Sequence, residues 1–316
     1  MYEKYYGLRS KPFDLIPDPD TVFMSDSHQE ALAVLRYGVI DRKGFLLLTG
    51  GVGTGKTTLL QVLSQSIDSK VHLCLLSNPT LSINEFYYFL AAKYGLPEYD
   101  FNKAKFMLQY ADFLRLCREK KERVLLIIDE AHALPEDLLE EIRLLSNQEH
   151  QEFGLMSIFL VGQPELNERL ASDRMLPLRQ RIGIRFHLEP FSKEETQQYI
   201  NFRLMKAGCQ RGNLFDPSAV ETIHALSKGI PRLINVICDQ ALLSGFAEEK
   251  SVVDQTIITA CINEMQISGK VVELPHSPEP AEKRRLSKWF VAVNFGLGIA
   301  IILAGVILYL FVVNNR

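Results

Sequence analysis

Gly50-Gly51-Val52-Gly53-Thr54-Gly55-Lys56-Thr57 is the stretch from which the rest of this 316-residue chain can be interpreted. It matches the phosphate-binding loop G-x-x-x-x-G-K-[S/T] at every fixed position. The apolar run Phe45–Leu48 precedes it, and residues Thr58–Leu63 follow it with helical spacing. A strand, a glycine-rich loop and a helix in this order predict a P-loop nucleotide-binding domain of the α/β class.

Each residue type in this loop has a physical role toward a polyphosphate. Glycines let main-chain N–H groups face phosphate oxygens with no Cβ in the way, and the helix that follows adds its positive dipole end. Lys56 is a charge placed for the β- and γ-phosphates, and the Thr57 hydroxyl is a ligand for Mg²⁺. The residues expected to bind ATP here are Gly50, Gly51, Val52, Gly53, Thr54, Gly55, Lys56, Thr57 and Thr58.

A second apolar run, Val124–Ile128, ends in acidic residues. Asp129 is expected to hold Mg²⁺ through water, and Glu130 is expected to polarise the attacking water. We expect His132 to support this site structurally and not to act in catalysis.

Polar residues near two later strands extend the predicted site. Gln163 follows the strand candidate Leu155–Val161, at the sheet edge that faces ligands in open α/β folds. Its amide is expected to orient the lytic water or to read the γ-phosphate, and a loop-capping amide is the alternative. Arg179 and Arg181 precede a short strand. They are either fingers that reach a neighbouring subunit's γ-phosphate or surface residues in ion pairs.

Beyond this strand the pattern predicts helices alone. Ser192–Glu195 is a capping box, Asp216-Pro217 places proline at a first helical position, and Pro231 begins a third helix. Arg232 lies at that helix start, where the dipole disfavours a cation, so we expect it to sense nucleotide.

The two ends of the chain differ in composition. Three prolines within residues 12–20 exclude a regular helix there, and the interleaved apolar residues predict an extended arm. This arm either packs on an apolar surface or covers the nucleotide base. Trp289–Val313 contains no charged residue and is long enough to cross a bilayer as one helix. Lys283, Arg284, Arg285 and Lys288 precede it, so we expect the N-terminal part to lie in the cytoplasm and the span in the inner membrane.

The overall composition disfavours several other classes of protein. The net charge of −3 and the pI of about 6.2 give no general attraction to nucleic acid. Five scattered cysteines without a C-x-x-C pair indicate reduced thiols, not disulfides or a metal site. The N-terminus lacks the apolar run of a signal peptide.

With these motifs assembled, residues 1–267 resemble the AAA+ ATPases of the general secretion pathway protein A (ExeA) family. Val161–Leu166 and Leu178–Ile182 are the more specific segments, since the phosphate loop and the Asp-Glu pair are common to the superfamily. The resemblance implies a five-stranded parallel sheet, a helical lid, and assembly into a ring or partial ring. It also implies sensor roles for Gln163 and Arg232 and a trans-acting finger at Arg179 or Arg181.

The resemblance also sets expectations for organisation and partners. Members of the family power assembly of secretion, pilus or polysaccharide-export machinery, and the secretion member carries a peptidoglycan-binding domain beyond its membrane helix. Only three residues follow Val313, so we expect an inner-membrane partner protein instead of peptidoglycan contact. The expected parts are an N-terminal arm (1–26), an AAA+ P-loop ATPase domain (27–190), a helical lid (191–267), a basic linker (268–288) and a transmembrane helix (289–313).

Two other functions remain open at this level. One is a DNA-binding adaptor ATPase of the transposition type, which the membrane span and the acidic pI disfavour. The other is a nucleotide-gated scaffold with little turnover.

Overall fold

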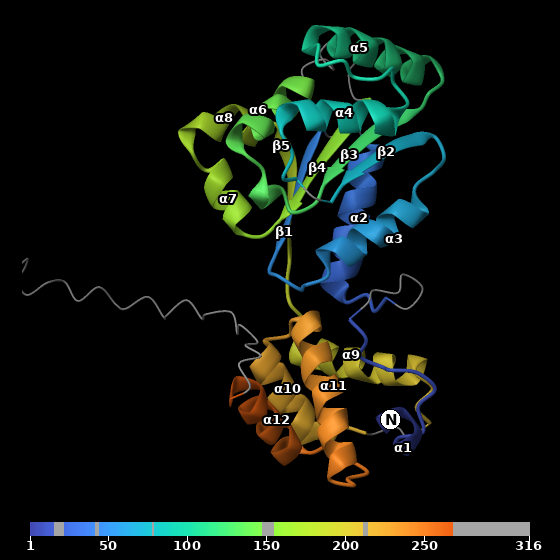
Figure 1. Cartoon of the computed structure of the whole chain (residues 1–316), viewed down its shortest axis with the longest axis vertical. Helices are drawn as coiled ribbons and strands as arrows, with labels where there is room; N and C mark the ends of the chain where they lie inside the picture. The colour runs from blue at the N-terminus through green and yellow to red at the C-terminus, as the bar shows by residue number, and fades with distance from the viewer. Residues whose placement is uncertain (16–21, 42–43, 78, 147–154, 211–213, 268–316) are drawn as a thin grey trace, which may run out of the picture. The chain divides into compact units, whose positions relative to one another are not determined.

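The computed structural model describes residues 1–15, 22–41, 44–77, 79–146, 155–210 and 214–267, all within one compact unit, Met1–Lys270 (Figure 1). The expected basic linker, the expected span Trp289–Val313 and residues 16–21 of the proline-rich arm lie outside the described residues. Among the helices that are described, none is both long enough and apolar enough to cross a membrane.

Five parallel strands form one sheet in the order β2-β3-β4-β1-β5. In this sheet Thr49 pairs with Gly162, and Leu76 pairs with Ile128. The carboxyl ends of the strands therefore meet at one edge, and the expected five-stranded parallel sheet of the α/β class is confirmed. The strands are β1 (Phe45–Gly50), β2 (Val71–Leu76), β3 (Arg123–Ile128), β4 (Met156–Gly162) and β5 (Ile182–Leu188).

The two faces of the sheet bury different side chains. Leu46, Leu48 and Ile127 belong to a mostly aliphatic cluster with α2 and α3, whereas the opposite face packs against aromatic rings of α4 and α5, including Phe86 and Tyr110. Figure 1 shows α2 and α3 on one side of the sheet and α4 and α6 on the other. The helices of this part are α2 (Asp26–Ile40), α3 (Lys56–Ser66), α4 (Ile83–Tyr94), α5 (Lys103–Glu119), α6 (Glu136–Leu145), α7 (Glu165–Leu170) and α8 (Leu176–Arg179), with 3₁₀ turns η2 (Ala131–Ala133) and η4 (Asp173–Met175).

The helices after β5 form a second hydrophobic core. Ser192 and Glu195 make the expected capping box at the first of these helices, and Asp216 accepts a hydrogen bond from the Ala219 main-chain N at 2.7 Å to cap the next. These side-chain caps satisfy donors that helix starts leave free. The helices are α9 (Lys193–Lys206), α10 (Pro217–Ser227), α11 (Pro231–Ala247) and α12 (Gln255–Ile267).

The N-terminal segment is part of this helical core. α1 (Tyr2–Tyr5) packs against α11, and Tyr6 is 1% exposed. Phe13 makes an edge contact with Phe215 across a centroid distance of 6.0 Å. The start of the chain is thus held on the helices that follow the sheet, which lie about 200 residues later in the sequence.

Candidate active site

A cavity of about 430 Å³ lies at the carboxyl edge of the sheet. It is lined by the phosphate loop, by the ends of β3 and β4, by the N-terminal segment and by the helices after β5. The expected site residues among its lining are Val52, Gly53, Gly55, Lys56, Thr57, Thr58, Glu130, Gln163 and Arg232. Residues spread over 180 positions of the sequence therefore share one concave surface.

Two glycines of the phosphate loop have left-handed main-chain conformations and lie close to side chains of other elements. Gly53 and Gly55 have φ values of +77° and +102°, which side chains rarely tolerate. A Cβ at Gly53 would lie 2.8 Å from Cβ of Arg232, and one at Gly55 would lie 2.9 Å from Nε2 of His28. The loop is thus enclosed by α2 on one side and by the start of α11 on the other.

Lys56 points back into the loop that precedes it. Its Nζ donates to the carbonyl oxygens of Gly50 at 2.8 Å and Gly51 at 2.9 Å, and the residue is 5% exposed. Burial lowers the pKa of Lys56, while the nearby carboxylates of Glu130 and Asp129 act in the opposite direction. A polyphosphate in the cavity would supply the negative charge that this buried ammonium needs.

Thr57, which lines the cavity, and its partner Asp129 offer two oxygen ligands for a metal ion. Oγ1 of Thr57 donates to Oδ2 of Asp129 at 2.7 Å, and the main-chain N of Glu130 donates to Oδ1 at 2.9 Å. Burial raises the pKa of Asp129, although both hydrogen bonds oppose that shift. A hydroxyl and a carboxylate are the hard oxygen ligands that Mg²⁺ prefers, so these residues fit that ion.

Glu130 lies in a strained turn directly after β3. Its φ of 55° is in the left-handed region, and its side chain is 43% exposed and lines the cavity. The guanidinium of Arg169, from α7, donates to the main-chain oxygens of His132 and Leu134. A residue from a distant helix therefore fixes the turn that carries this carboxylate.

Gln163 reaches the same cavity from the end of β4. Its amide Nε2 lies 2.9 Å from Nε2 of His132, and its main-chain N donates to Nδ1 of His132 at 3.3 Å. Oε2 of Glu130 lies 3.4 Å from that same Nδ1. The three side chains therefore form one connected group, in which His132 occupies the middle.

The side of the cavity formed by the start of α11 carries Arg232. Its main-chain N donates to the Gly53 carbonyl oxygen at 3.4 Å, and its exposed side chain lines the cavity. Tyr199 and Asn235 are neighbours in the lining, joined by a 2.7 Å hydrogen bond. A ligand on the phosphate loop would meet the helices after β5 through these residues.

The N-terminal segment reaches the cavity as well as the helical core. Asp14, Leu15, Val22 and Phe23 are among the lining residues. The Arg203 guanidinium donates to the carbonyl oxygen of Asp14 at 2.9 Å. The arm therefore packs on apolar surface, as one expectation had it, and also lines the cavity. That it covers a nucleotide base stays a prediction.

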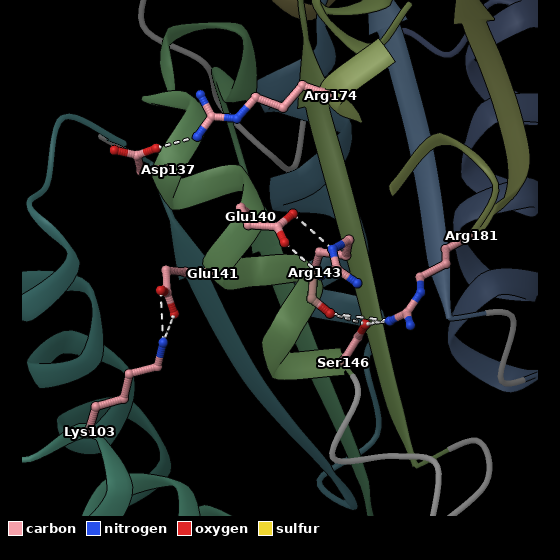
Figure 2. A network of polar contacts seen from close by, with 8 residues as sticks. All are labelled: Lys103, Asp137, Glu140, Glu141, Arg143, Ser146, Arg174 and Arg181. Carbon is pink, nitrogen blue, oxygen red and sulfur yellow. Dashed lines mark hydrogen bonds and ion pairs between the residues drawn. The ribbon is translucent and has the colours of Figure 1, made fainter. Parts of the chain in front are cut away.

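The two expected finger residues lie away from the cavity lining. Arg181 donates through Nη1 to Oγ of Ser146 at 2.6 Å and to the Arg143 carbonyl oxygen at 3.2 Å, and Figure 2 shows it directed at the end of α6. Arg179 donates to the Ala171 carbonyl oxygen at 3.1 Å. Either arginine would have to leave contacts within its own chain to reach a neighbouring subunit.

Sequence patterns did not indicate two histidine contacts of this site. His28 Nε2 lies 3.0 Å from the Thr54 carbonyl oxygen, and its Nδ1 lies 2.7 Å from Oγ of Ser25. His132 was expected to have a structural role, but its contact with Gln163 spans 31 residues and has no local signal. The pairing of β3 with β4 brings His132 and Gln163 together.

Comparisons with known proteins agree with this geometry. A family model described as an AAA domain matches residues 40–170. General secretion pathway protein A of Aeromonas hydrophila is 41% identical over 249 residues, which cover 78% of this chain and 45% of that protein. The chain thus spans about half the length of this curated relative.

Solved structures share the fold at low sequence identity. Drosophila ORC bound to DNA has a TM-score of 0.62 and 15% identity, covering 85% of this chain and 67% of that one. ORC2 of Aeropyrum pernix, in ADPNP and ADP complexes, has a TM-score of 0.56 and 17% identity, covering 81% and 72%. These similarities show the fold alone.

Proposed function

We propose that this chain is a Mg²⁺-dependent ATPase, because an AAA-domain model matches residues 40–170 and the chain is similar to general secretion pathway protein A. The main support for this proposal is the set of residues that share one cavity. A single cavity brings together a buried lysine, an Asp-Thr oxygen pair beside it, an exposed carboxylate, an amide and a lid arginine. Phosphoryl transfer to water needs little else from a protein, because positioning and charge stabilisation supply most of the catalysis.

Each residue has a defined part in this reaction. Lys56 and the loop N–H groups bind the β- and γ-phosphates, while Thr57 and Asp129 hold Mg²⁺ directly or through water. Bound Mg²⁺ would neutralise charge that develops on the phosphate oxygens. Glu130 accepts a proton from the attacking water, Gln163 orients that water or reads the γ-phosphate, and Arg232 reports the nucleotide state to the helical lid.

Hydrolysis by the purified full-length chain tests this assignment. We expect Mg²⁺-dependent release of phosphate from ATP, which Lys56→Ala lowers by weakening ATP binding. Absence of turnover in the parent, with nucleotide binding intact, would instead favour a nucleotide-gated scaffold. The readout separates the two functions without requiring a partner protein.

Oligomerisation with a finger supplied by a neighbouring subunit is the second part of the proposal. It rests on the position of Arg179 and Arg181 beside the start of β5, outside the cavity of their own chain. A mixture of Lys56→Ala and Arg181→Ala subunits should recover activity, because each supplies what the other lacks. The same mixture is made with Arg179→Ala, since the geometry does not choose between the arginines. Absence of rescue in both mixtures would exclude a finger acting in trans.

Membrane anchoring and a role in assembling or remodelling a bacterial envelope machine complete the proposal. The supporting observations are the uncharged stretch Trp289–Val313, its basic flank and the similarity to a general secretion pathway protein. A reporter active only outside the cytoplasm, fused after Arg316, should be active. A silent reporter on a stable, membrane-bound fusion would contradict this orientation. Crosslinking in cells from within residues 289–313 should capture an inner-membrane partner protein.

A further inference from the structure

The ring of His132 lies between the two residues proposed to act on water and on the γ-phosphate. Arg169 donates to the main-chain oxygens of His132 itself and of Leu134, two residues later. A Cβ at Gly162 would lie only 3.2 Å from its Nδ1, so the glycine permits this approach. The ring position is therefore fixed by its surroundings, while its side chain keeps 19% exposure to solvent.

Nδ1 of His132 faces two groups with opposite requirements. The main-chain N of Gln163 lies 3.3 Å away and can only donate, whereas Oε2 of Glu130 lies 3.4 Å away and, when ionised, can only accept. A neutral imidazole carries one proton. Nδ1 can therefore accept from Gln163 or donate to Glu130, but it cannot do both at once.

The same proton determines how the Gln163 amide turns. Nε2 of His132 lies 2.9 Å from that amide. With the proton on Nδ1, Nε2 accepts from the Gln163 NH₂ group, and the amide oxygen is left for the cavity. With the proton on Nε2, the ring donates to the amide oxygen, and the NH₂ group is left for the cavity that Gln163 lines.

We propose that His132 is a positioning residue whose tautomer couples Glu130 to Gln163. A γ-phosphate accepts a hydrogen bond from the Gln163 NH₂ group, which favours the tautomer protonated on Nε2. Nδ1 then has no proton to hold Glu130, so this carboxylate is free to accept a proton from water. Without a γ-phosphate, the tautomer protonated on Nδ1 binds Glu130.

The ring carries one proton throughout this exchange. Nδ1 gives a proton to solvent water and Nε2 takes one from it, so the charge of the site is unchanged. The inference rests on the proposed function, because it assumes that the cavity binds ATP. It adds a reason why Glu130 would act only when a γ-phosphate is present.

Nucleotide affinities test this coupling without requiring turnover. Glu130→Ala removes the acceptor that favours the state without γ-phosphate. It should therefore raise the ratio of the affinity for a non-hydrolysable ATP analogue to that for ADP. Part of this rise is electrostatic and should persist in every background. A further factor of about 2 to 10, the worth of one hydrogen bond, should appear only when His132 and Gln163 are both present.

Three backgrounds are compared by calorimetric titration with Mg²⁺: the parent, His132→Ala and Gln163→Ala. His132→Asn and His132→Gln are added because their amides place a polar group near Nδ1 or Nε2 but cannot exchange tautomers. Both should lose the coupling, whereas a residue with only a structural role would retain it in at least one of them. His72→Ala, at a half-exposed histidine on β2 paired with Glu122, is the matched control and should leave the ratio unchanged.

An equal effect of Glu130→Ala in the parent and in His132→Ala would overturn the coupling while leaving the ATPase assignment intact. A parent protein that binds neither nucleotide would instead overturn the proposed function. The two failures are therefore distinguishable in one set of titrations.

Discussion

The phosphate loop and the turn from Asp129 to Leu134 meet at one cavity, but they are held in different ways. Within the loop, contacts are local: Lys56 binds the carbonyl oxygen of Gly50, six residues away, and Thr54 Oγ1 donates to the Gly51 carbonyl oxygen at 2.9 Å. The turn depends on distant side chains, since its partners Gln163 and Arg169 lie 31 and 37 residues from His132.

This difference suits the loop to nucleotide binding and the turn to control of the hydrolytic step. A loop that holds its lysine and its threonine through its own carbonyl oxygens presents its N–H groups and its ammonium in one arrangement, which suits nucleotide binding. A turn held by α7 and by the end of β4 changes when those elements move, which suits control of the hydrolytic step. Substitutions in the two regions should therefore affect different measured quantities.

Glu130→Gln should produce the largest effect, and it should fall on turnover. The amide cannot accept the proton of the attacking water, so kcat should fall about 10²- to 10⁴-fold. The affinity for ATP should not fall, because Lys56 and the loop are untouched. Phosphate release and nucleotide titration measure the two quantities, and turnover at the parental rate would show that another residue activates the water.

Lys56→Ala should give the next largest effect, and it should fall on binding. Loss of hydrogen bonds from a charged donor costs about 1.5–3 kcal/mol, or roughly 10- to 150-fold in affinity. Lys120→Ala, at an exposed lysine that ends α5, should bind ATP like the parent. Unchanged affinity in Lys56→Ala would mean that phosphate binding does not depend on this ammonium.

The same division explains how much the sequence could predict. The strands, the capping boxes and the phosphate loop depend on patterns within a few residues, so local patterns could predict them. The five-stranded parallel sheet was implied by the family resemblance, and it is confirmed. Most of the residues expected to share a site line one cavity. Those that are not among its lining residues are Gly50, Gly51, Thr54, Asp129, Arg179 and Arg181. The roles of all these residues stay predictions.

Contacts between distant residues could not be predicted in this way. Nothing near His132 indicates Gln163, and nothing near His28 indicates Thr54, because both contacts depend on how the strands and helices pack. The packing of α1 with the last helices has the same origin, since Tyr2 and Asp239 are partners 237 residues apart. Periodicity predicts elements and cannot predict which of their ends meet.

Gly55→Ala tests whether the stability of the phosphate loop depends on the main-chain conformation of this glycine. Gly55 has a φ of +102°, and an added Cβ would lie 2.9 Å from His28 Nε2. We expect a loss of about 1–3 kcal/mol in unfolding free energy from the strained conformation. Gly51→Ala is the matched control, because its Cβ would meet only Thr54 Cγ2 at an ordinary 3.5 Å. Equal midpoints of urea unfolding for the two variants would contradict the strain argument.

His28 is an exception to the local contacts of the loop, because its side chain contacts the main chain of Thr54, 26 residues away. A carbonyl oxygen can only accept, so Nε2 of His28 carries the proton that binds Thr54, and Nδ1 accepts from Ser25. Burial lowers the pKa of His28 below its usual 6.5. Between that lowered value and 6.5 the unfolded chain binds more protons than the folded chain, so the free energy of unfolding should fall as the pH falls.

His28→Gln isolates this smallest effect, since a glutamine amide can still donate to Thr54 but does not titrate. The parent should lose stability between pH 7.5 and pH 5.5 more steeply than the variant does, as measured by urea unfolding at a series of pH values. Glu195, the acidic group that favours the charged ring, is unchanged in both proteins and cancels from the difference. If the two slopes agree, His28 contributes no pH dependence through its burial. If the variant also loses ATP affinity, the loop depends on a long-range contact, as the turn does. The two regions would then differ only in the groups that they bring to the cavity.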